Sequence, residues 1–464
     1  MGNEMSHTTP RLSVVRVWLG VLGVLLAGLL VYASIVPVTP RYTSFYNGVD
    51  GFLQLRWLDL NVYRRADWVA NALVVIPAGF CLAGAVDFGK PHRWALLLAA
   101  PLIFLNLATL VVVIEFLQFW FPPRTRSQND VFAGVIGGAA GPALWLICGR
   151  PILRGLILVC TGPVTKQRVG WLLALFVLAN FAYSLMPLDL MVSKAEWQKK
   201  WDAGRIVLVP ELGMLLSLSQ WKGWILAAAR TAVVGFLATL YRGPKFAFAV
   251  VVFVAIVCEL LQLPTFTRQA STTDVLAGVA GGGLGIWVAN RWAFWLGVLE
   301  KPIVWLGLFA TCLLGIVAVL LVRDAAWVDD PEIIAGHWRA FFTWPMSKYY
   351  YTSEFSAGTN VLAKLIVFAA AGYLLHGAVH CSKPKVRRGL RLTGWAVIFM
   401  VGTIIEVGQV YLTTGVSDAS DVLIYLLGAA LGGAAFPALR PDRLADPRGL
   451  AAQGNPRGSI VNGH

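Results

Sequence analysis

Long apolar segments dominate the pattern of hydrophobic and polar positions along this chain. Each segment is about 20 residues long, the length that an α-helix needs to cross the hydrocarbon core of a bilayer. We expect twelve membrane-spanning helices, at residues 15–37, 69–87, 94–120, 130–149, 169–187, 223–241, 245–264, 273–295, 302–322, 360–379, 392–413 and 420–438. Long loops follow only the first, fifth and ninth segments. The pattern therefore predicts an all-α polytopic membrane protein.

One polar motif occurs three times along the chain. In each copy a Glu is followed by a Gln three positions later and by an Asp fifteen positions later. The copies are Glu115, Gln118 and Asp130; Glu259, Gln262 and Asp274; and Glu406, Gln409 and Asp421. Glycines recur seven and eleven positions after each Asp, as Gly137 and Gly141, Gly281 and Gly285, and Gly428 and Gly432. Agreement at five offsets indicates a triplicated unit of four helices.

The three repeats are predicted to enter the membrane in the same direction, because four helices per repeat is an even number. We place them at residues 1–160, 161–300 and 301–440, followed by a disordered cytoplasmic tail at 441–464. The Glu and Gln of each motif share one helix face. The Asp begins the next helix, where a carboxylate can cap free N–H groups. Close helix packing is predicted at glycines four apart in that helix, namely Gly134 and Gly138, Gly278 and Gly282, and Gly428 and Gly432.

Composition and charge add an environment and an orientation. The chain is 58% apolar and only 13% charged, about half the charged share of a soluble protein. Lys and Arg concentrate on the side of the amino terminus, and an excess of positive charge marks the cytoplasmic side of a membrane. We therefore expect a multi-pass protein of a bacterial inner membrane, with both termini in the cytoplasm and the motifs at the outer surface. The net charge of +14 then faces anionic lipid rather than nucleic acid.

The motif resembles the pattern of the VanZ-like family of membrane proteins, some of which are associated with resistance to the glycopeptide teicoplanin. That pattern has an Asn and a Pro-x-Gly on the second helix and Glu-x-x-Gln on the third. It continues with Arg-x-x-Asp-x-x-Asp before a glycine-rich fourth helix. The first repeat matches best, with Asp67, Asn71, Pro77, Gly79, Glu115, Gln118, Arg124, Asp130, Gly137 and Gly141. It departs at Ser127 and Gly134.

The other two repeats keep less of the family pattern. The second keeps Glu259, Gln262, Arg268 and Asp274, lacks the Asn and the Pro-x-Gly, and has Arg230 inside its second helix. The third keeps Glu406, Gln409, Asp418 and Asp421, with Gly415 in place of the Arg and Asn360 and Lys364 in place of Asp67 and Asn71. The resemblance implies three tandem VanZ-like units in a cell-envelope protein linked to antibiotic resistance.

Two interpretations of the polar clusters stay open. In one, the Glu, Gln, Arg and Asp of a repeat form an internal clasp, because ionisable groups at membrane depth need partners. Arg124 and Arg268 are then the expected partners of Glu115 and Glu259. In the other interpretation the cluster is an outer-leaflet pocket for a ligand head group, where an Arg suits phosphate or carboxylate.

The third repeat has no Arg in its turn, so its acids need another cation. Lys364 lies near the outer end of the second helix, and a long lysine side chain tolerates several ångströms of mismatch. We therefore predict that Lys364 pairs with Glu406 or Asp421.

The leading functional hypothesis is a non-enzymatic envelope protein. It would recognise an amphipathic or lipid-linked ligand at the outer leaflet, either a cell-wall precursor or a glycopeptide-type antibiotic. Aromatic residues in the outer loops, among them Trp57, Trp197 and Trp338, suit such a ligand or an ordinary interfacial belt. The alternative is a transporter or flippase, a class in which parallel repeats are common. An intramembrane enzyme has only the carboxylates in its favour. We predict membrane lipids as partners and neither cofactor nor metal site.

Overall fold

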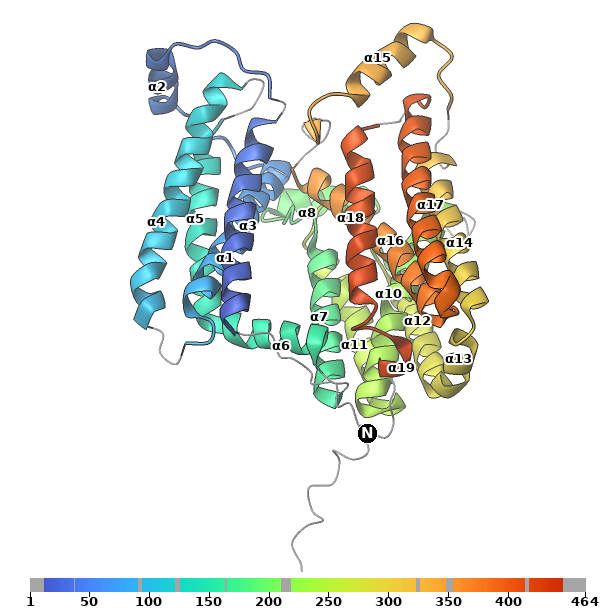
Figure 1. Ribbon diagram of the computed structural model, residues 1–464. Coiled ribbons are helices and arrows are strands. Elements are labelled where there is room, and N and C mark those ends of the chain that lie inside the picture. Colours follow the sequence, from blue (N-terminus) through green and yellow to red (C-terminus); the bar gives the residue numbers. More distant parts are fainter. Residues whose placement is uncertain are drawn as a thin grey trace, which may run out of the picture. The chain divides into compact units, whose positions relative to one another are not determined.

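The protein is an all-α polytopic membrane protein (Figure 1). The computed structural model describes residues 12–36, 38–90, 94–121, 126–162, 165–209, 218–322, 326–347, 354–413 and 417–444. Eleven helices in these ranges are long and apolar enough to cross a membrane, and α18 (Ala419–Ala435) is a shorter apolar helix. The predicted fold class is therefore confirmed. The predicted disordered tail lies outside the described residues from position 445 onward.

The first repeat is built from α1 (Leu12–Ile35), α3 (Val62–Asp87), α4 (Trp94–Leu117) and α5 (Gln128–Leu144). A short helix, α2 (Phe45–Leu53), lies in the loop between the first two, and η1 (Gln118–Trp120) extends α4. Helix α3 packs against α1, α4 and α5. The buried core contains Leu30, Val75, Leu107 and Val111. The chain then continues through the π-helical turn η2 (Trp145–Gly149) and α6 (Arg150–Thr161).

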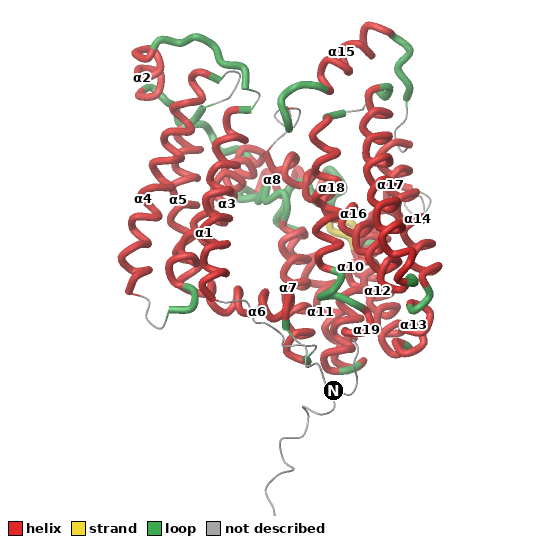
Figure 2. Tube along the Cα trace, in the orientation of Figure 1, coloured by secondary structure: helices red, strands yellow, loops and turns green. Residues whose placement is uncertain are grey.

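The second repeat is built from α7 (Lys166–Leu185), α10 (Leu218–Arg242), α11 (Pro244–Gln262) and α12 (Thr272–Asn290). Its loop contains α8 (Lys194–Asp202), which begins with a capping box between Ser193 and Glu196. Two short strands, β1 (Ile206–Val207) and β2 (Ala270–Ser271), pair in parallel (Figure 2). They join the long loop to the turn that precedes α12. Helix α13 (Trp292–Leu299) follows the repeat.

The third repeat is built from α14 (Pro302–Val317) with its π-helical extension η3 (Ala318–Val322), α16 (Glu354–Cys381), α17 (Pro384–Val410) and α18. Its loop contains α15 (Pro331–Phe341), and α19 (Pro441–Leu444) follows α18. Proline stands in the first turn of α11 and of α17, where its missing N–H costs no helical hydrogen bond. The same turn chemistry thus starts the third helix in two repeats.

Contacts along the chain divide it into two compact parts. One part consists of Thr8–Leu153 with Trp305–Ala434, and it holds the first and third repeats. The other consists of Arg154–Val304 with the residues before Thr8 and after Ala434, and it holds the second repeat.

Glycines bring the second and fourth helices of every repeat into backbone contact. A Cβ atom added eleven positions after the motif Asp would come within 3 Å of a carbonyl oxygen on the second helix. The pairs are Gly141 with Ile76 (2.7 Å), Gly285 with Ala232 (1.9 Å) and Gly432 with Ala369 (1.8 Å). The predicted close packing is confirmed. These contacts also align the three second helices, so that Asn71, Ala227 and Lys364 occupy the same place.

Candidate functional site

The same backbone hydrogen bond fixes the long loop of each repeat to the end of the motif helix. An amide N–H of the loop donates to the carbonyl oxygen of the residue five positions after the motif Glu. The pairs are Arg41 with Trp120 (2.8 Å), Met191 with Pro264 (2.9 Å) and Val328 with Tyr411 (2.9 Å). The loop therefore returns to the motif end in all three repeats.

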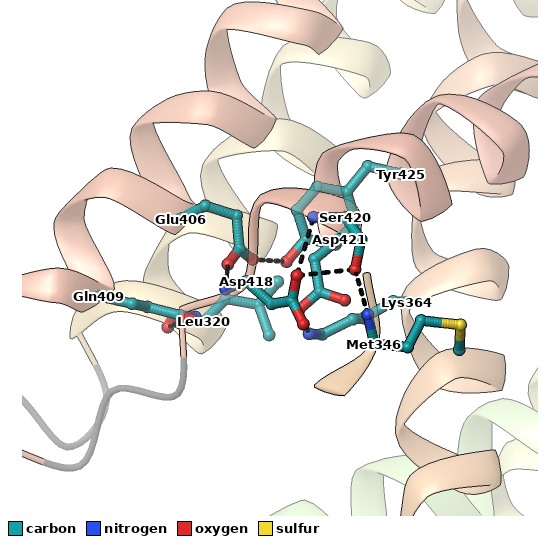
Figure 3. Close-up of polar contacts among 9 residues, drawn as sticks. All are labelled: Leu320, Met346, Lys364, Glu406, Gln409, Asp418, Ser420, Asp421 and Tyr425. Carbon is teal, nitrogen blue, oxygen red and sulfur yellow. Dashed lines mark hydrogen bonds and ion pairs between the residues drawn. The ribbon is translucent and has the colours of Figure 1, made fainter. Parts of the chain in front are cut away.

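A buried polar cluster occupies the motif end of the third repeat (Figure 3). The Lys364 ammonium forms an ion pair with Asp421, and the lysine is only 8% exposed. Glu406 is fully buried and accepts hydrogen bonds from the Tyr425 hydroxyl and, at 2.9 Å, from the backbone N–H of Asp418. The predicted pairing of Lys364 is confirmed, with Asp421 as its partner.

The turn before α18 is held by further hydrogen bonds. The Asp418 carboxylate accepts from the Ser420 N–H at 2.9 Å and from its hydroxyl at 2.7 Å. The Met346 N–H donates to the Ser420 hydroxyl at 3.0 Å. Gln409 donates to the Leu320 carbonyl at 3.1 Å and so ties α17 to η3 instead of binding the motif carboxylates. Gly415 lies outside the described residues.

Glu259 of the second repeat is bound in a similar way. Its carboxylate accepts from the Gln262 side chain at 2.7 Å and from the backbone N–H of Ser271 at 3.0 Å. Ser271 lies twelve positions after Glu259, as Asp418 lies twelve positions after Glu406. One carboxylate–backbone contact therefore closes the turn in both repeats.

The expected pairing of Arg268 with Glu259 is wrong. The Arg268 guanidinium donates to the carbonyl oxygens of Met186 at 2.6 Å and Tyr183 at 3.0 Å, at the end of α7. It also lies 4.6 Å from the centre of the Tyr183 ring. The last carbonyls of a helix have no partner within it, and an arginine fork can satisfy two of them at once. The Glu259 carboxylate instead accepts its hydrogen bonds from the Gln262 side chain and from the backbone N–H of Ser271.

A polar pocket opens between the four helices of the second repeat. It is small, and it is lined by Asn180, Ala227, Arg230, Thr231, Ala255, Cys258, Glu259, Asp274 and Gly278. Arg230 lies over the Tyr183 ring at 4.7 Å, and its buried Nη1 has no partner among the described residues. Within that same part of the chain, the half-buried Asp274 makes no hydrogen bond or ion pair.

Three exchanges of large for small residues distinguish this pocket from the same place in the third repeat. The aligned pairs, third repeat first, are Lys364 and Ala227, Phe368 and Thr231, and Tyr425 and Gly278. In the third repeat the Phe368 and Tyr425 rings stack with centres 4.2 Å apart. The pocket is therefore the space that these side chains fill in the third repeat.

In the first repeat two neutral side chains bind Asp130. The Asn71 amide and the Ser127 hydroxyl each donate to the Asp130 carboxylate at 2.7 Å. Asp67 stands one turn before Asn71 and is half-buried. Glu115 and Gln118 are 7% and 6% exposed. Arg124, the expected partner of Glu115, lies outside the described residues.

A buried lysine outside the repeated motif supports the second repeat. Lys200 of α8 is fully buried, and its ammonium donates to the carbonyls of Gln262 at 2.7 Å, Leu263 at 2.9 Å and Thr265 at 2.6 Å. Burial lowers the pKa of Lys200 to about 8, while the nearby Asp189 carboxylate opposes this shift. At neutral pH the ammonium form still predominates, so all three N–H donors are matched with acceptors.

The third repeat has a counterpart of this contact. The Nδ1 atom of His337, on α15, lies 2.7 Å from the carbonyl oxygen of Val410. Val410 and Leu263 hold the same position, four residues after the motif Glu. No signal in the sequence distinguishes Lys200 from its neighbour Lys199, since both lie in a short polar helix. Only the fold reveals which of them is buried.

Comparison with known proteins places the repeats in a family context. A family model described as VanZ/LLP1 matches residues 19–149 and 309–440, together more than half of the chain. These regions hold the first and third repeats, and the second repeat lies between them. No curated protein and no solved structure matches the chain. Among the described residues, no group of three or more His, Cys, Asp or Glu is placed to hold a metal ion.

Proposed function

The chain belongs to the VanZ/LLP1 family, and we propose that it binds the head group of an amphipathic or lipid-linked molecule at the outer leaflet of a bacterial inner membrane. The two kinds of ligand that the family resemblance suggests are a cell-wall precursor and a glycopeptide-type antibiotic. In this proposal both termini are cytoplasmic and the motif ends of the repeats face outward.

The pocket of the second repeat is the observation that carries the proposal. The pocket is small and open to its surroundings, so it can take one compact charged or polar group rather than a whole drug-sized ligand. In this proposal one charged group of the head group enters this space, and the rest of the molecule stays outside it. Arg230 has a buried Nη1 without a partner among the described residues. Its guanidinium fork suits a phosphate or carboxylate group.

The other two repeats support this assignment by contrast. Asp130 is bound by Asn71 and Ser127, and Asp421 is bound by Lys364. A carboxylate that is already paired has less to gain from a ligand, because binding would first have to break the internal contact. We therefore assign the structural clasp to the first and third repeats and ligand binding to the second.

Analysis of co-purified molecules tests the proposal. The full-length protein is purified in mild detergent as wild type, Arg230→Met and Arg291→Met, and bound amphipathic molecules are quantified by mass spectrometry. Arg291 is an exposed residue after α12, and its replacement removes the same charge outside the pocket. We expect one class of molecule to be enriched on the wild type and on Arg291→Met and lost from Arg230→Met. Identical profiles for all three would contradict the proposal.

The outer location has its own test. A reporter that is active only outside the cytoplasm should be active when inserted near Asp330 and inactive when fused after His464. We expect this pattern because Lys and Arg are in excess on the side of the membrane that holds the termini, which marks the cytoplasmic side. The reverse pattern would place the pocket at the cytoplasmic surface and would rule out the outer-leaflet part of the proposal.

A further inference from the structure

We infer that the pocket of the second repeat binds a primary ammonium group, in the place that the Lys364 ammonium occupies in the third repeat. The inference rests on the proposed function and adds the chemistry of the ligand. In the third repeat the chain supplies this cation itself, and in the second repeat the ligand supplies it.

Ala227 of the second repeat and Lys364 of the third occupy equivalent places. Gly285 packs against Ala232 and Gly432 packs against Ala369, which sets Ala227 and Lys364 at the same height on the second helix. The motif acids occupy the same offsets in both repeats. The carboxylate–backbone contact twelve residues after the Glu also forms in both. The surroundings of position 227 are therefore those in which Lys364 sits.

The place of the Lys364 ammonium holds a positive charge beside the motif Asp of the third repeat. In the third repeat the Lys364 ammonium binds Asp421 and lies 5.8 Å from the centre of the Tyr425 ring. In the second repeat Asp274 has neither hydrogen bond nor ion pair within the described ranges. The small side chain of Ala227 leaves the space beside it open. A carboxylate at the edge of a membrane is stabilised when a cation enters such a space.

Arg230 does not take over the role of the lysine. It lies one turn after Ala227, where it stacks on Tyr183 at 4.7 Å and donates to the Leu226 carbonyl at 3.4 Å. It forms no ion pair with Asp274 among the described residues. Its buried Nη1 remains available to an acidic group. The pocket is therefore lined by two carboxylates, Asp274 and Glu259, and by a guanidinium whose charge acts on both without an ion pair in the described part of the chain.

The lining favours a primary ammonium over other cations. An alkylammonium group is a compact charge with three N–H donors, and the pocket presents oxygen acceptors on Asp274, Asn180 and Thr231. A quaternary ammonium is bulkier and has no N–H to donate. Arg230 would receive an anionic group of the same molecule. The ligand class is therefore a zwitterionic head group in which a primary amine accompanies a phosphate or carboxylate.

Lipid binding tests this inference directly. Native mass spectrometry of the full-length protein in detergent compares phosphatidylethanolamine, which has a primary ammonium, with phosphatidylcholine, which has a quaternary one. We expect phosphatidylethanolamine to bind at least tenfold more tightly, and equal binding would overturn the inference. Soluble phosphoethanolamine then identifies the source of the amine. Competition by it supports a free zwitterion as ligand, and failure to compete supports a membrane lipid.

Three variants locate the binding in the pocket. Asp274→Asn and Ala227→Lys should each weaken phosphatidylethanolamine binding at least tenfold, the first by removing the carboxylate and the second by supplying the ammonium from the chain. Ala203→Lys adds the same charge at an exposed position after α8, outside the membrane-spanning helices, and should bind like the wild type. Normal binding by folded Ala227→Lys would overturn the inference, and Asp274→Asn decides alone if that variant does not fold.

The failure of this inference can be told apart from the failure of the proposed function. If the molecules lost from Arg230→Met carry no amine, the pocket still binds a head group, but the ammonium inference is wrong. If no molecule depends on Arg230, the proposed function itself is wrong.

Discussion

The second and third repeats carry the same acids on the same backbone, yet one is open and the other is closed. In the third repeat Lys364 pairs with Asp421 and the Tyr425 ring fills the space beside it. In the second repeat the aligned residues are Ala227 and Gly278, and both line a pocket. The comparison teaches that the Glu and Asp of the motif do not by themselves make a binding site. Residues on the second and fourth helices decide whether the acids are satisfied internally.

The largest expected effect comes from opening the closed repeat. Lys364→Met leaves Asp421 buried without its cation, and losing one partner of a buried ion pair costs about 3–5 kcal/mol. Equilibrium unfolding of the purified protein in detergent measures the loss. Adding Asp421→Asn should recover most of it, because the remaining polar group is then neutral. A single variant as stable as the wild type would show that the pair contributes nothing.

Removing the contact between the long loop and the motif helix should cost more stability in the second repeat than in the third. Lys200→Met removes three hydrogen bonds at the end of α11 and leaves the Leu263 and Thr265 carbonyl oxygens without the lysine donor, which we expect to cost about 3 kcal/mol. His337→Phe removes one contact to Val410 and should cost about 1 kcal/mol. Lys199→Met, an exposed neighbour on the same helix, serves as the control in the same unfolding assay. Equal losses for the two lysine variants would contradict the buried position of Lys200.

The glycine contacts should matter equally in both repeats. A methyl group at Gly285 or Gly432 would meet a carbonyl oxygen at 1.9 or 1.8 Å, so each helix pair must separate. We expect Gly285→Ala and Gly432→Ala to cost about 1–3 kcal/mol each in thermal or chemical unfolding. Gly283→Ala faces open space and should be neutral or slightly stabilising. A loss for Gly283→Ala as large as for Gly285→Ala would show that helix propensity or insertion, not contact, governs these positions.

A more modest effect is expected from a chemical rescue of the third repeat after its lysine is removed. Lys364→Ala gives the third repeat the same residue that the second repeat has at the equivalent position, Ala227. Propylammonium should then stabilise Lys364→Ala, by about 1.4 kcal/mol at ten times its dissociation constant. The wild type should not respond, and tetramethylammonium should not replace propylammonium. Equal stabilisation of wild type and variant would indicate a general effect of the salt.

Much of the fold could be predicted because its signals are periodic or repeated. Apolar length revealed the spanning helices, and fixed offsets revealed the three units. The pairing of Lys364 with Asp421 was predictable because Gly415 had replaced the only other cation of that turn and a lone buried acid is costly. In each case the partners are side chains that the sequence displays.

The remaining features depend on groups that the sequence does not display. Arg268 and Lys200 bind backbone carbonyls, which every residue has, so no pattern of residue types reveals such partners. The pocket was also hidden, because the second repeat lacks the Asn and Pro-x-Gly that would align its second helix. Of that motif the second repeat keeps only the glycine, Gly235, which packs against Gly282. Without that register, Ala227 could not be recognised as the counterpart of Lys364.

The contact between the motif Glu and the backbone twelve residues later has a consequence for how such a chain can diverge. The main-chain N–H is present whichever side chain stands at that position, and here the position holds Ser271 in one repeat and Asp418 in another. Mutation can therefore change that residue without loosening the turn. A duplicated unit built in this way can acquire a new specificity by mutation while the contact that closes its turn is kept.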